Sequence, residues 1–466
     1  MSINQLIELT RRSFRTTSAV INTIGQNIAN ENTEGFSRRR VSLESASIAS
    51  PGVQVVTPMG TSTGIGVSIG DIDRVRDQVL AAATWEANAG LGASDEEARI
   101  LSALENLFPV NSDASLTNQL SRFWDGWSDV ADTPTSLSAR VALINRAQSL
   151  TLTLNRISTD IDRLQDDSIA QLSQTVVDFN FRLDEIGRLN QRIATGRAAN
   201  APDLAGEDRR DQLVKELSEM APLQIQLDDQ GMYNVTIGGM VVVQGDTVEH
   251  LDLDTTGVLP TLTFESSGIS FNPTPGDDGR LGALMRALTV AYPDARQQLD
   301  DLASTLVDRI NTLHSNGFGL DGNTGLNFFD PAGVTAGTIA LSTDIADPRS
   351  IAASDDPDPT VLSDNDTALA ILAERTVDQA PLGDVSFEEH AINMTSEIGA
   401  QVQRANDQYE GHLAVVNYLG ALERGVSAVS INEELSNLIL YQQTFAAAAR
   451  VLSTAQSMMD TLLSLP

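Results

Sequence analysis

The sequence predicts an α+β multidomain protein: terminal helices that pair as a coiled coil, an elongated α-helical bundle, and an inserted β-rich domain. Three observations predict it. The 466 residues exceed one ordinary core, since domains average roughly 150 residues. Apolar residues recur with seam-like spacing at both chain ends. The apolar period switches from helix to strand at Pro222 and returns to helix after residue 280.

The N-terminal helix is predicted from apolar or small residues that alternate steps of four and three. This is the a/d spacing of a coiled-coil seam. The seam positions are Ile3, Ile7, Thr10, Phe14, Thr17, Ile21, Ile24 and Ile28.

The C-terminal helix has the same spacing, and Ser430 with Glu433 fits a capping box at its start. A helix with one apolar stripe is marginal alone in water. The two helices are therefore expected to pair with each other or with neighbouring copies; the alternative is two amphipathic helices on a globular core. The seam positions are Ile431, Leu435, Leu438, Gln442, Phe445, Ala449, Leu452, Gln456, Met459 and Leu463.

Long helices dominate the N-terminal half. One apolar stripe runs from Leu116 to Val130, and another runs from Leu143 to Leu164 and continues to Ile193 after a one-residue phase slip. Residues 136–194 contain no proline and a single glycine, Gly187. This segment predicts one very long helix or two nearly end to end.

Strands are predicted after Pro222. Leu223, Ile225 and Leu227 alternate with polar residues, Asp228–Gly231 is a turn, and alternation then resumes to about residue 272. Residues 281–314 and 386–424 read as helices, and 315–366 are rich in Gly, Asp and Pro. The predicted domains are 1–35 with 428–466 (terminal coiled coil), 36–220 with 280–320 and 386–427 (long-helix bundle), and 221–279 with 321–385 (β-rich outer domain).

Charge and composition exclude several functions. The net charge of −33 repels phosphate backbones and anionic membrane surfaces, so we expect no nucleic-acid or membrane partner. The absence of cysteine excludes disulfides and thiolate metal sites. No apolar run reaches roughly 18 residues, so no transmembrane helix is expected. The N-terminal segment lacks the apolar block of a cleavable secretory signal.

The first forty residues depart from this acidity, with six arginines, three glutamates and a net charge of +3. Such a basic arm suits an acidic surface on another copy of the chain; the alternative is an ordinary solvated helix face. The arginines are Arg11, Arg12, Arg15, Arg38, Arg39 and Arg40.

No motif points to catalysis. His250, His314, His390 and His412 are scattered and form no metal-ligand spacing. No Gly-x-Ser-x-Gly elbow is present. We therefore expect no catalytic residue and no enzyme activity.

Two glycine-rich segments resemble ligand loops only in part. Gly60, Gly64, Gly66 and Gly70 have the wrong spacing for a phosphate loop. Asp321–Gly325 has the rhythm of a calcium loop, but the twelfth position is Ala332 rather than glutamate. We expect no cofactor and no metal.

The chain ends carry a specific resemblance. Asn27-Ile-Ala-Asn30 followed by Asn32-Thr-Glu-Gly-Phe-Ser-Arg38 resembles the N-terminal signature of bacterial flagellar rod, hook and hook-associated proteins. Glu434-Leu-Ser-Asn-Leu-Ile-Leu-Tyr-Gln-Gln443, with Phe445, is similar to the C-terminal segment of that superfamily.

The middle of the chain narrows the resemblance to the hook-associated protein 1 family, the hook–filament junction proteins. The similarity covers nearly the whole chain and is weakest in 327–385. The similar segments are Phe123-Trp-Asp-Gly-Trp127, Leu189-Asn-Gln-Arg-Ile193, Asp208-Arg-Arg-Asp-Gln-Leu213, Gly279-Arg-Leu-Gly-Ala-Leu284 and Asn311 with His314 and Gly317.

The resemblance implies a structural protein of the extracellular flagellum, exported unfolded by the flagellar type III apparatus without a cleaved signal. It implies a ring of identical subunits, with hook protein on one side and a second hook-associated protein on the filament side. It also implies an export chaperone at the C-terminal helix. The predicted assembly residues are Ile3, Ile7, Phe14, Ile21, Ile24, Ile28, Asn27, Asn30, Gly35, Leu435, Leu438, Phe445, Leu452, Met459 and Leu463.

Three alternatives remain open. Another axial flagellar protein, a hook or distal rod component, shares both termini but should lack the long helices of 136–194. An exported enzyme would place its chemistry in 222–385, where no convergent metal or nucleophile set is seen. A solitary coiled-coil adhesin or scaffold would not need the Asn27–Asn30 signature.

Overall fold

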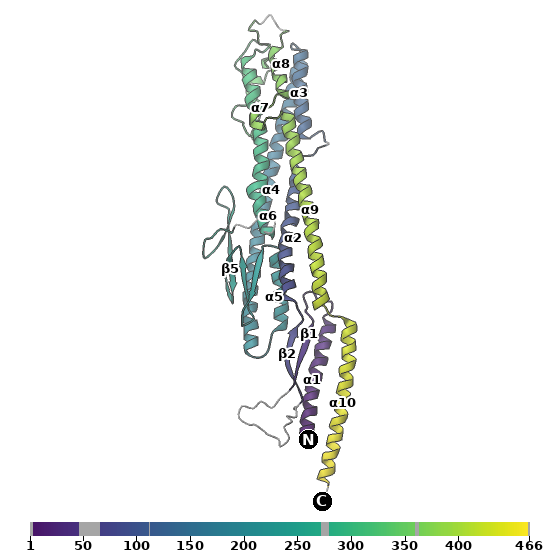
Figure 1. Cartoon of the computed structure of the whole chain (residues 1–466). Helices are drawn as coiled ribbons and strands as arrows, with labels where there is room; N and C mark the ends of the chain where they lie inside the picture. The colour runs from purple at the N-terminus through teal and green to yellow at the C-terminus, as the bar shows by residue number, and fades with distance from the viewer. Residues whose placement is uncertain (1–2, 46–65, 111, 272–278, 359–362, 465–466) are drawn as a thin grey trace.

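The computed structural model describes residues 3–45, 66–110, 112–271, 279–358 and 363–464. These residues form a long rod, with both chain ends at the same end of it (Figure 1). A helical body makes up most of the length, and a slimmer terminal part lies below it. The prediction of an α+β chain with an elongated helical bundle agrees with this architecture.

The spine of the body is α4, Leu137–Ala198, a single helix of 62 residues. At 1.5 Å per residue it is about 90 Å long. It runs without a break through the phase slip in its apolar stripe, which decides between the one-helix and two-helix alternatives. Ser136 begins it by accepting a hydrogen bond from the Ala139 amide.

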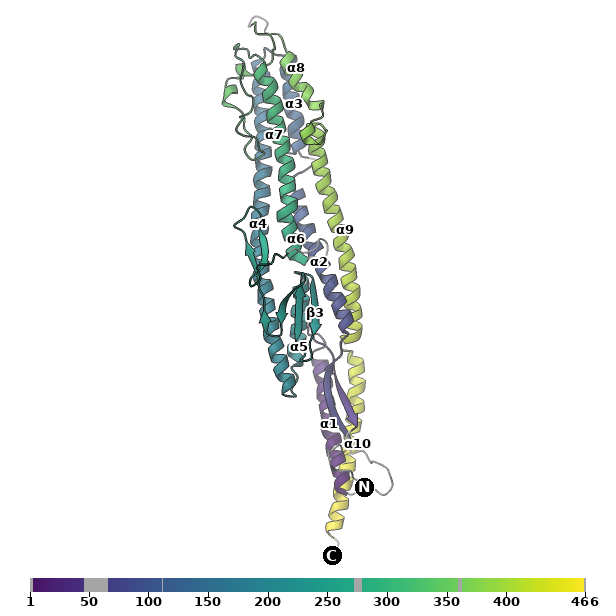
Figure 2. The same cartoon turned by 60° about the vertical axis from the view of Figure 1, so that its left-hand side comes forward.

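The other helices of the body pack around α4 (Figure 2). They bury one large aliphatic and aromatic core, in which Trp124 and Trp127 are 0% exposed, and a small second cluster between α2 and α9. The body helices are α2 (Gln78–Glu105), α3 (Leu116–Asp132), α5 (Leu204–Ser218), α6 (Gly279–Arg286), α7 (Tyr292–Asn316) and α9 (Phe387–Ser427), with the π-helical turn η1 (Ala287–Ala291) between α6 and α7.

The predicted strands are present. β3 (Leu223–Leu227), β4 (Tyr233–Ile237), β5 (Met240–Gln244) and β6 (Thr247–Val248) form an antiparallel sheet in chain order. The β3–β4 turn forms because Asp228 accepts hydrogen bonds from the amides of Gln230 and Met232. A second pair, β7 (Leu251–Asp254) and β8 (Thr261–Phe264), follows.

Residues 321–385 differ from the prediction that placed them in the β-rich domain. The described residues of this stretch form isolated β-bridges but no strand. They lie at the far end of the rod, against α3 and α7 (Figure 1). Phe328 and Phe329 anchor it by packing on Phe123. Its short helices are η2 (Thr343–Ile345), η3 (Pro348–Ser350), α8 (Asp366–Ala373), η4 (Glu374–Thr376) and η5 (Ala380–Leu382).

The terminal part consists of α1 (Ile3–Ala29), the antiparallel pair β1 (Arg39–Ser45) and β2 (Val67–Arg74), and α10 (Ile431–Leu463). The β1–β2 pair was not predicted; it lies along α1, although residues 36–77 were assigned to the bundle (Figure 1). The apolar alternation in β1 is only Val41 and Leu43, and a register shift in the pairing lies between them, which explains why the pair was missed. No helix in the described ranges is long and apolar enough to cross a membrane.

A glycine in α2 tests the packing between α2 and α5. A Cβ at Gly92 would overlap the backbone oxygen of Glu219, whereas Gly411 in α9 has open space around it. We expect Gly92→Ala to destabilise the body by about 1–3 kcal/mol, as overpacking does. Gly411→Ala should be neutral or stabilising by up to about 1 kcal/mol. Thermal unfolding followed by circular dichroism measures both; an unchanged melting temperature for Gly92→Ala would refute this packing.

Candidate assembly interface

The terminal helices α1 and α10 lie side by side, as both figures show. The rings of Phe14 and Phe445 meet edge to face, with centroids 4.7 Å apart. Val20, Ile24 and Ala455 are at most 7% exposed, so they form the closed part of the contact. The expectation that the two chain ends pair with each other therefore holds within one copy.

The predicted seam residues divide into two groups. On α1, Ile24 is buried and the other five predicted residues are half-buried. On α10, Leu438, Leu452 and Met459 are half-buried, but Leu435, Phe445 and Leu463 are 43%, 38% and 78% exposed. A single copy thus covers only part of the α10 apolar surface. That the seam residues form contacts between subunits stays a prediction.

The three polar and glycine residues of the N-terminal signature shape the turn after α1. The buried side chain of Asn27 donates to the Arg39 carbonyl and accepts from the Arg39 amide, both at 2.9 Å. Asn30 donates to the Gln26 carbonyl. Gly35 has a φ of 79°, which favours glycine. These residues fix the path from α1 to β1; a direct role in assembly stays a prediction.

Arg38 ties the start of α10 to this turn. Its guanidinium binds Glu434 at 2.7 Å and both oxygens of Glu433 at 3.0 and 3.1 Å. Hydrogen bonding to Glu433 raises the pKa of Arg38 above its usual value. The predicted capping box is wrong: Ser430 is the N-cap but its side chain makes no cap hydrogen bond, and Glu433 faces Arg38 instead.

A buried ion-pair cluster joins the β1–β2 hairpin to α5. Arg74 binds Glu207 at 2.8 Å, Asp208 at 3.0 Å and Asp211 at 2.6 Å. All four side chains are between 7% and 11% exposed. Arg39 also approaches Asp208, and Arg76 binds Asp211. We call this set the joint cluster: Arg39, Arg74, Arg76, Glu207, Asp208 and Asp211.

Two further arginines support the joint cluster from the body. Arg197 binds Glu207 at 2.8 Å. Arg210 is 1% exposed, lies 3.6 Å from the Tyr233 ring centroid, and has its pKa lowered to about 10 by burial. Burial raises the pKa of Glu207, but Arg74 and Arg197 outweigh it and leave that pKa below its usual value. The carboxylate is therefore charged in the folded chain.

The joint cluster matters because the terminal part shares no apolar core with the body. Within the described residues, both clusters of buried apolar side chains lie between Ala81 and Ala405. The described contacts between the two parts are therefore mainly polar: the joint cluster, and the hydrogen bond that the Arg38 amide donates to the Ser427 carbonyl at 3.0 Å. The basic N-terminal arm was expected to bind an acidic surface on another copy. Two of its arginines, Arg38 and Arg39, form ion pairs within the same chain instead. Arg11, Arg12 and Arg15 remain exposed on α1.

The histidines have structural surroundings. His314 is buried; its Nδ1 lies 2.7 Å from the Leu326 carbonyl and its Nε2 accepts from the Ala352 amide at 2.9 Å. Burial lowers its pKa to about 4, so the ring is neutral. His412 contacts the Ser94 hydroxyl. The fold uses these rings to fix loops and helices.

The structure describes part of the two glycine-rich segments that were predicted not to bind a ligand. Asp321 accepts from the amide and side chain of Asn323 and from the Ser350 hydroxyl, which makes an Asx turn. Gly60 and Gly64 lie outside the described residues. The carboxylates of Asp355, Asp364 and Asp366 lie within 4.8 Å of one another, but nothing else there indicates a cation. The absence of cofactor and metal stays a prediction.

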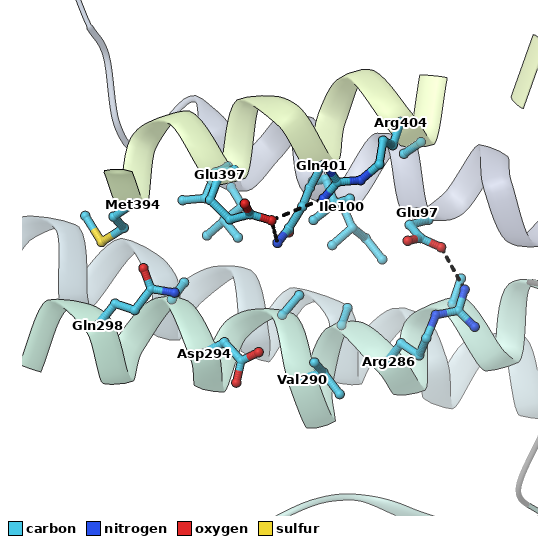
Figure 3. A pocket seen from close by; sticks show the side chains of 18 of the residues that line it. Glu97, Ile100, Arg286, Val290, Asp294, Gln298, Met394, Glu397, Gln401 and Arg404 are labelled. Atoms are coloured by element: carbon cyan, nitrogen blue, oxygen red, sulfur yellow. Dashed lines mark hydrogen bonds and ion pairs between the residues drawn. The ribbon is translucent and has the colours of Figure 1, made fainter. Parts of the chain in front are cut away.

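A pocket of about 310 Å³ lies between α2, the α6–η1–α7 segment and α9 (Figure 3). Its floor is apolar, with Ile100 at the centre, and its rim carries ion pairs of Glu97 with Arg286 and of Glu397 with Arg404. No histidine, hydroxyl or thiol side chain lines it. The pocket therefore lacks the hydroxyl, thiol and imidazole groups of the commonest nucleophilic sites.

Two family models match the chain. Residues 101–329 match the family described as the flagellar hook-associated protein FlgK helical domain. Residues 420–465 match the family described as the flagellar basal body rod FlgEFG protein C-terminal segment. The first covers most of the helical body and strands β3 to β8, and the second covers the end of α9 and α10.

Full-length relatives agree. The chain is 24% identical to flagellar hook-associated protein 1 of Bacillus subtilis over 501 residues, covering 98% of this chain and 97% of the relative. It is 24% identical to flagellar hook-associated protein 1 of Salmonella typhimurium over 567 residues, covering 99% and 100%. The solved flagellar hook junction protein FlgK from Burkholderia pseudomallei shares the fold, with a TM-score of 0.63 and 15% identity, over 75% of this chain and 100% of that one.

The fold is a long helical body with paired terminal helices. The body and the C-terminal helix each match a family of flagellar proteins, which defines a structural protein of the bacterial flagellum. Along nearly its whole length the chain is similar to flagellar hook-associated protein 1, and residues 101–329 match the helical domain of that family. The family and the fold predicted from the sequence are confirmed.

Arg74 tests the joint cluster. Removing one partner of a buried ion pair costs about 3–5 kcal/mol, so Arg74→Met should increase the open population of the hairpin by two or more orders of magnitude. Hydrogen exchange of the β1 and β2 amides should accelerate accordingly, while α4 amides keep their rates. Arg11→Met is the matched control, because the Arg11–Glu8 pair is exposed. Unchanged β1–β2 exchange in Arg74→Met would contradict an ionic joint.

His314 tests the pH dependence. Its folded pKa of about 4 lies below the unfolded value near 6.5, so between these values the unfolded chain binds a proton that the folded chain does not. The free energy of unfolding should therefore fall by about 3 kcal/mol from this group as pH drops through that window. His314→Gln should lose less stability than the native chain between neutral pH and about pH 4.5.

Urea unfolding followed by tryptophan fluorescence measures this, since Trp127 lies 6.3 Å from His314. Phe328→Leu is the control, because it loosens the packing beside His314 without removing a titratable group, so its pH slope should match that of the native chain. An equal pH slope for His314→Gln and the native chain would show that His314 does not titrate as proposed.

Proposed function

We propose that the chain is a structural subunit of the junction between the flagellar hook and filament, built as a ring of identical copies. The observation that carries this proposal is the full-length similarity to flagellar hook-associated protein 1. The role is mechanical, and the proposal includes no catalytic activity.

The α10 helix supports assembly. One copy leaves a set of large apolar side chains of α10 in water, and exposed apolar surface of this kind marks protein contacts. In the ring, neighbouring copies would cover these side chains. They are Leu435 (43% exposed), Ile439 (57%), Leu440 (57%), Val451 (42%), Met458 (51%) and Leu463 (78%).

The proposed partners follow from this position. Hook protein lies on one side of the ring, and a second hook-associated protein lies on the filament side. Before export the same α10 surface needs a cover in the cell, which fits an export chaperone at this helix. The chain would then leave through the flagellar type III apparatus as an unfolded polypeptide; the absence of cysteine means that no disulfide obstructs this route.

The nearest alternative, a hook or distal rod component, fits less well. The C-terminal match is described by rod proteins, so it does not separate the axial proteins. The match of residues 101–329 to the helical domain of a hook-associated protein favours the junction. The 62-residue helix α4 lies in this matched region.

Deletion of the gene in its native bacterium tests the proposal. We expect cells that keep their hooks, lack filaments and release monomeric flagellin into the medium, because filament subunits then have no junction on which to polymerise. Electron microscopy of cell surfaces and immunoblots of the medium measure both. Complementation with the native gene is the control.

Two results would contradict the junction role. Cells that lack hooks would place the chain earlier in the axial structure, in the hook or rod. Cells without a second copy of the gene that still swim normally would remove the chain from the flagellar axis altogether.

A further inference from the structure

The lower half of the body is a row of four helices in the order α4, α5, α2 and α9. Arg182 on α4 binds Glu216 on α5 at 3.0 Å. Asn88 on α2 lies 3.4 Å from Ser218 on α5. In both figures α4 and α9 are the outer helices, on opposite sides of this row (Figures 1 and 2).

Side-chain contacts place parts of the two outer helices at one level along the rod. Arg182 reaches α5 beside Ser218, Ser218 reaches Asn88, and Ser94 of the same helix α2 lies 3.1 Å from His412 on α9. These contacts run across the row from α4 to α9. Residues near 182 on α4 therefore lie opposite residues near 412 on α9.

The α9 edge carries an apolar stripe at this level. Val415, Tyr418, Leu422 and Val426 are 48%, 65%, 42% and 43% exposed. Their spacing of three and four residues puts them on one face of the helix. Residues 411–422 contain no Asp, Glu, Lys or Arg, in a chain whose charged fraction is 20%. Loss of charge around exposed aromatic and aliphatic side chains is typical of the centre of an interface.

The α4 edge carries a second apolar patch at the same level. Val177 and Phe181, one helical turn apart, are 59% and 58% exposed. Residues 168–177 before them contain no charged side chain. The β7–β8 hairpin lies at this edge, since Asn180 binds the Leu251 backbone, and its turn exposes Val258 at 96% (Figure 1).

We propose that the α9 edge of one copy packs against the α4 edge of the next, with Tyr418 of one copy against Phe181 of its neighbour. The proposal rests on the ring of the proposed function. In a ring of like-oriented copies, each subunit meets one neighbour through one edge and the other neighbour through the opposite edge. Both edges must then match at one level along the rod, which is the arrangement observed.

The partner at each edge is a second copy of this chain. A closed ring requires two different, matching surfaces on opposite edges of the subunit at one level along the rod, and the α9 and α4 edges fulfil this requirement. A different protein would need an apolar surface on one edge alone. Aromatic side chains at the centre of a contact dominate its stability, and each edge supplies one. The terminal helices and this lateral contact would act at two heights of the same ring.

Paired cysteines test the contact, because the chain has no native cysteine. A disulfide needs Cα atoms within about 7 Å. Within one copy α5 and α2 lie between residue 181 on α4 and residue 418 on α9. Three spacings of about 8–10 Å between helix axes put the two Cα atoms roughly 30 Å apart. Any disulfide between Phe181→Cys and Tyr418→Cys must therefore join two copies.

Full-length chain carrying both substitutions is expressed in the bacterium that lacks its native gene, and isolated flagella are oxidised. We expect dimers and higher multimers on non-reducing gels, while each single variant stays monomeric. Thr153→Cys with Tyr418→Cys is the matched control. Thr153 is also on α4 and partly exposed, but lies 28 residues away, about 42 Å along the helix, so this pair should not cross-link.

Several results would overturn the contact. Flagella that contain the Phe181→Cys/Tyr418→Cys chain only as monomer would contradict it, as would equal cross-linking of the Thr153→Cys control. Where that pair prevents incorporation, Val177→Cys with Leu422→Cys decides in the same way. Absence of the native chain from flagella would contradict the proposed function, and the ring contact with it.

Discussion

The joint cluster is the interaction on which the arrangement of the two parts depends. Arg74 alone binds three carboxylates of α5, and the terminal part contributes nothing to the apolar clusters of the body. Buried ion pairs hold a defined geometry but add little net stability, since desolvation offsets their attraction. The terminal helices can therefore be oriented by the body without being fused to its core.

The body and the terminal part solve different problems. The body closes its own core: α4 is one unbroken helix that buries apolar residues on both sides of its phase slip, and Phe328 and Phe329 cover the far end of the core. The terminal part stays open, because α10 keeps Ile439 and Leu463 in water. A body with a closed core and a terminal part with exposed apolar surface fit a chain whose body folds alone and whose terminal helices become covered on assembly. The α9 and α4 edges would extend that assembly onto the body.

The sequence predicted elements whose pattern is local. The apolar period of 116–194, the alternation after Pro222 and the seam spacing at both ends each identified an element of the right kind. Contacts between distant residues were not predictable: nothing local in Arg74 or Asp211 indicates that they meet, and Glu433 fitted a capping box but binds Arg38. Residues 321–385 were misplaced because Gly- and Asp-rich composition describes a coil without saying which surface it covers. The β1–β2 pair was missed because each strand has only a short apolar alternation, Val41 with Leu43 and Val67 with Ile69, among polar residues.

The central claim is that neighbouring copies cover the apolar face of α10, and single-cysteine labelling tests it directly. Ile439→Cys in the otherwise cysteine-free chain should react rapidly with a maleimide in the purified monomer, because Ile439 is 57% exposed. In isolated flagella the same cysteine should be protected, whereas Thr153→Cys on the body should label in both. Equal labelling of Ile439→Cys in monomer and flagella would contradict the account, because α10 would then remain open after assembly.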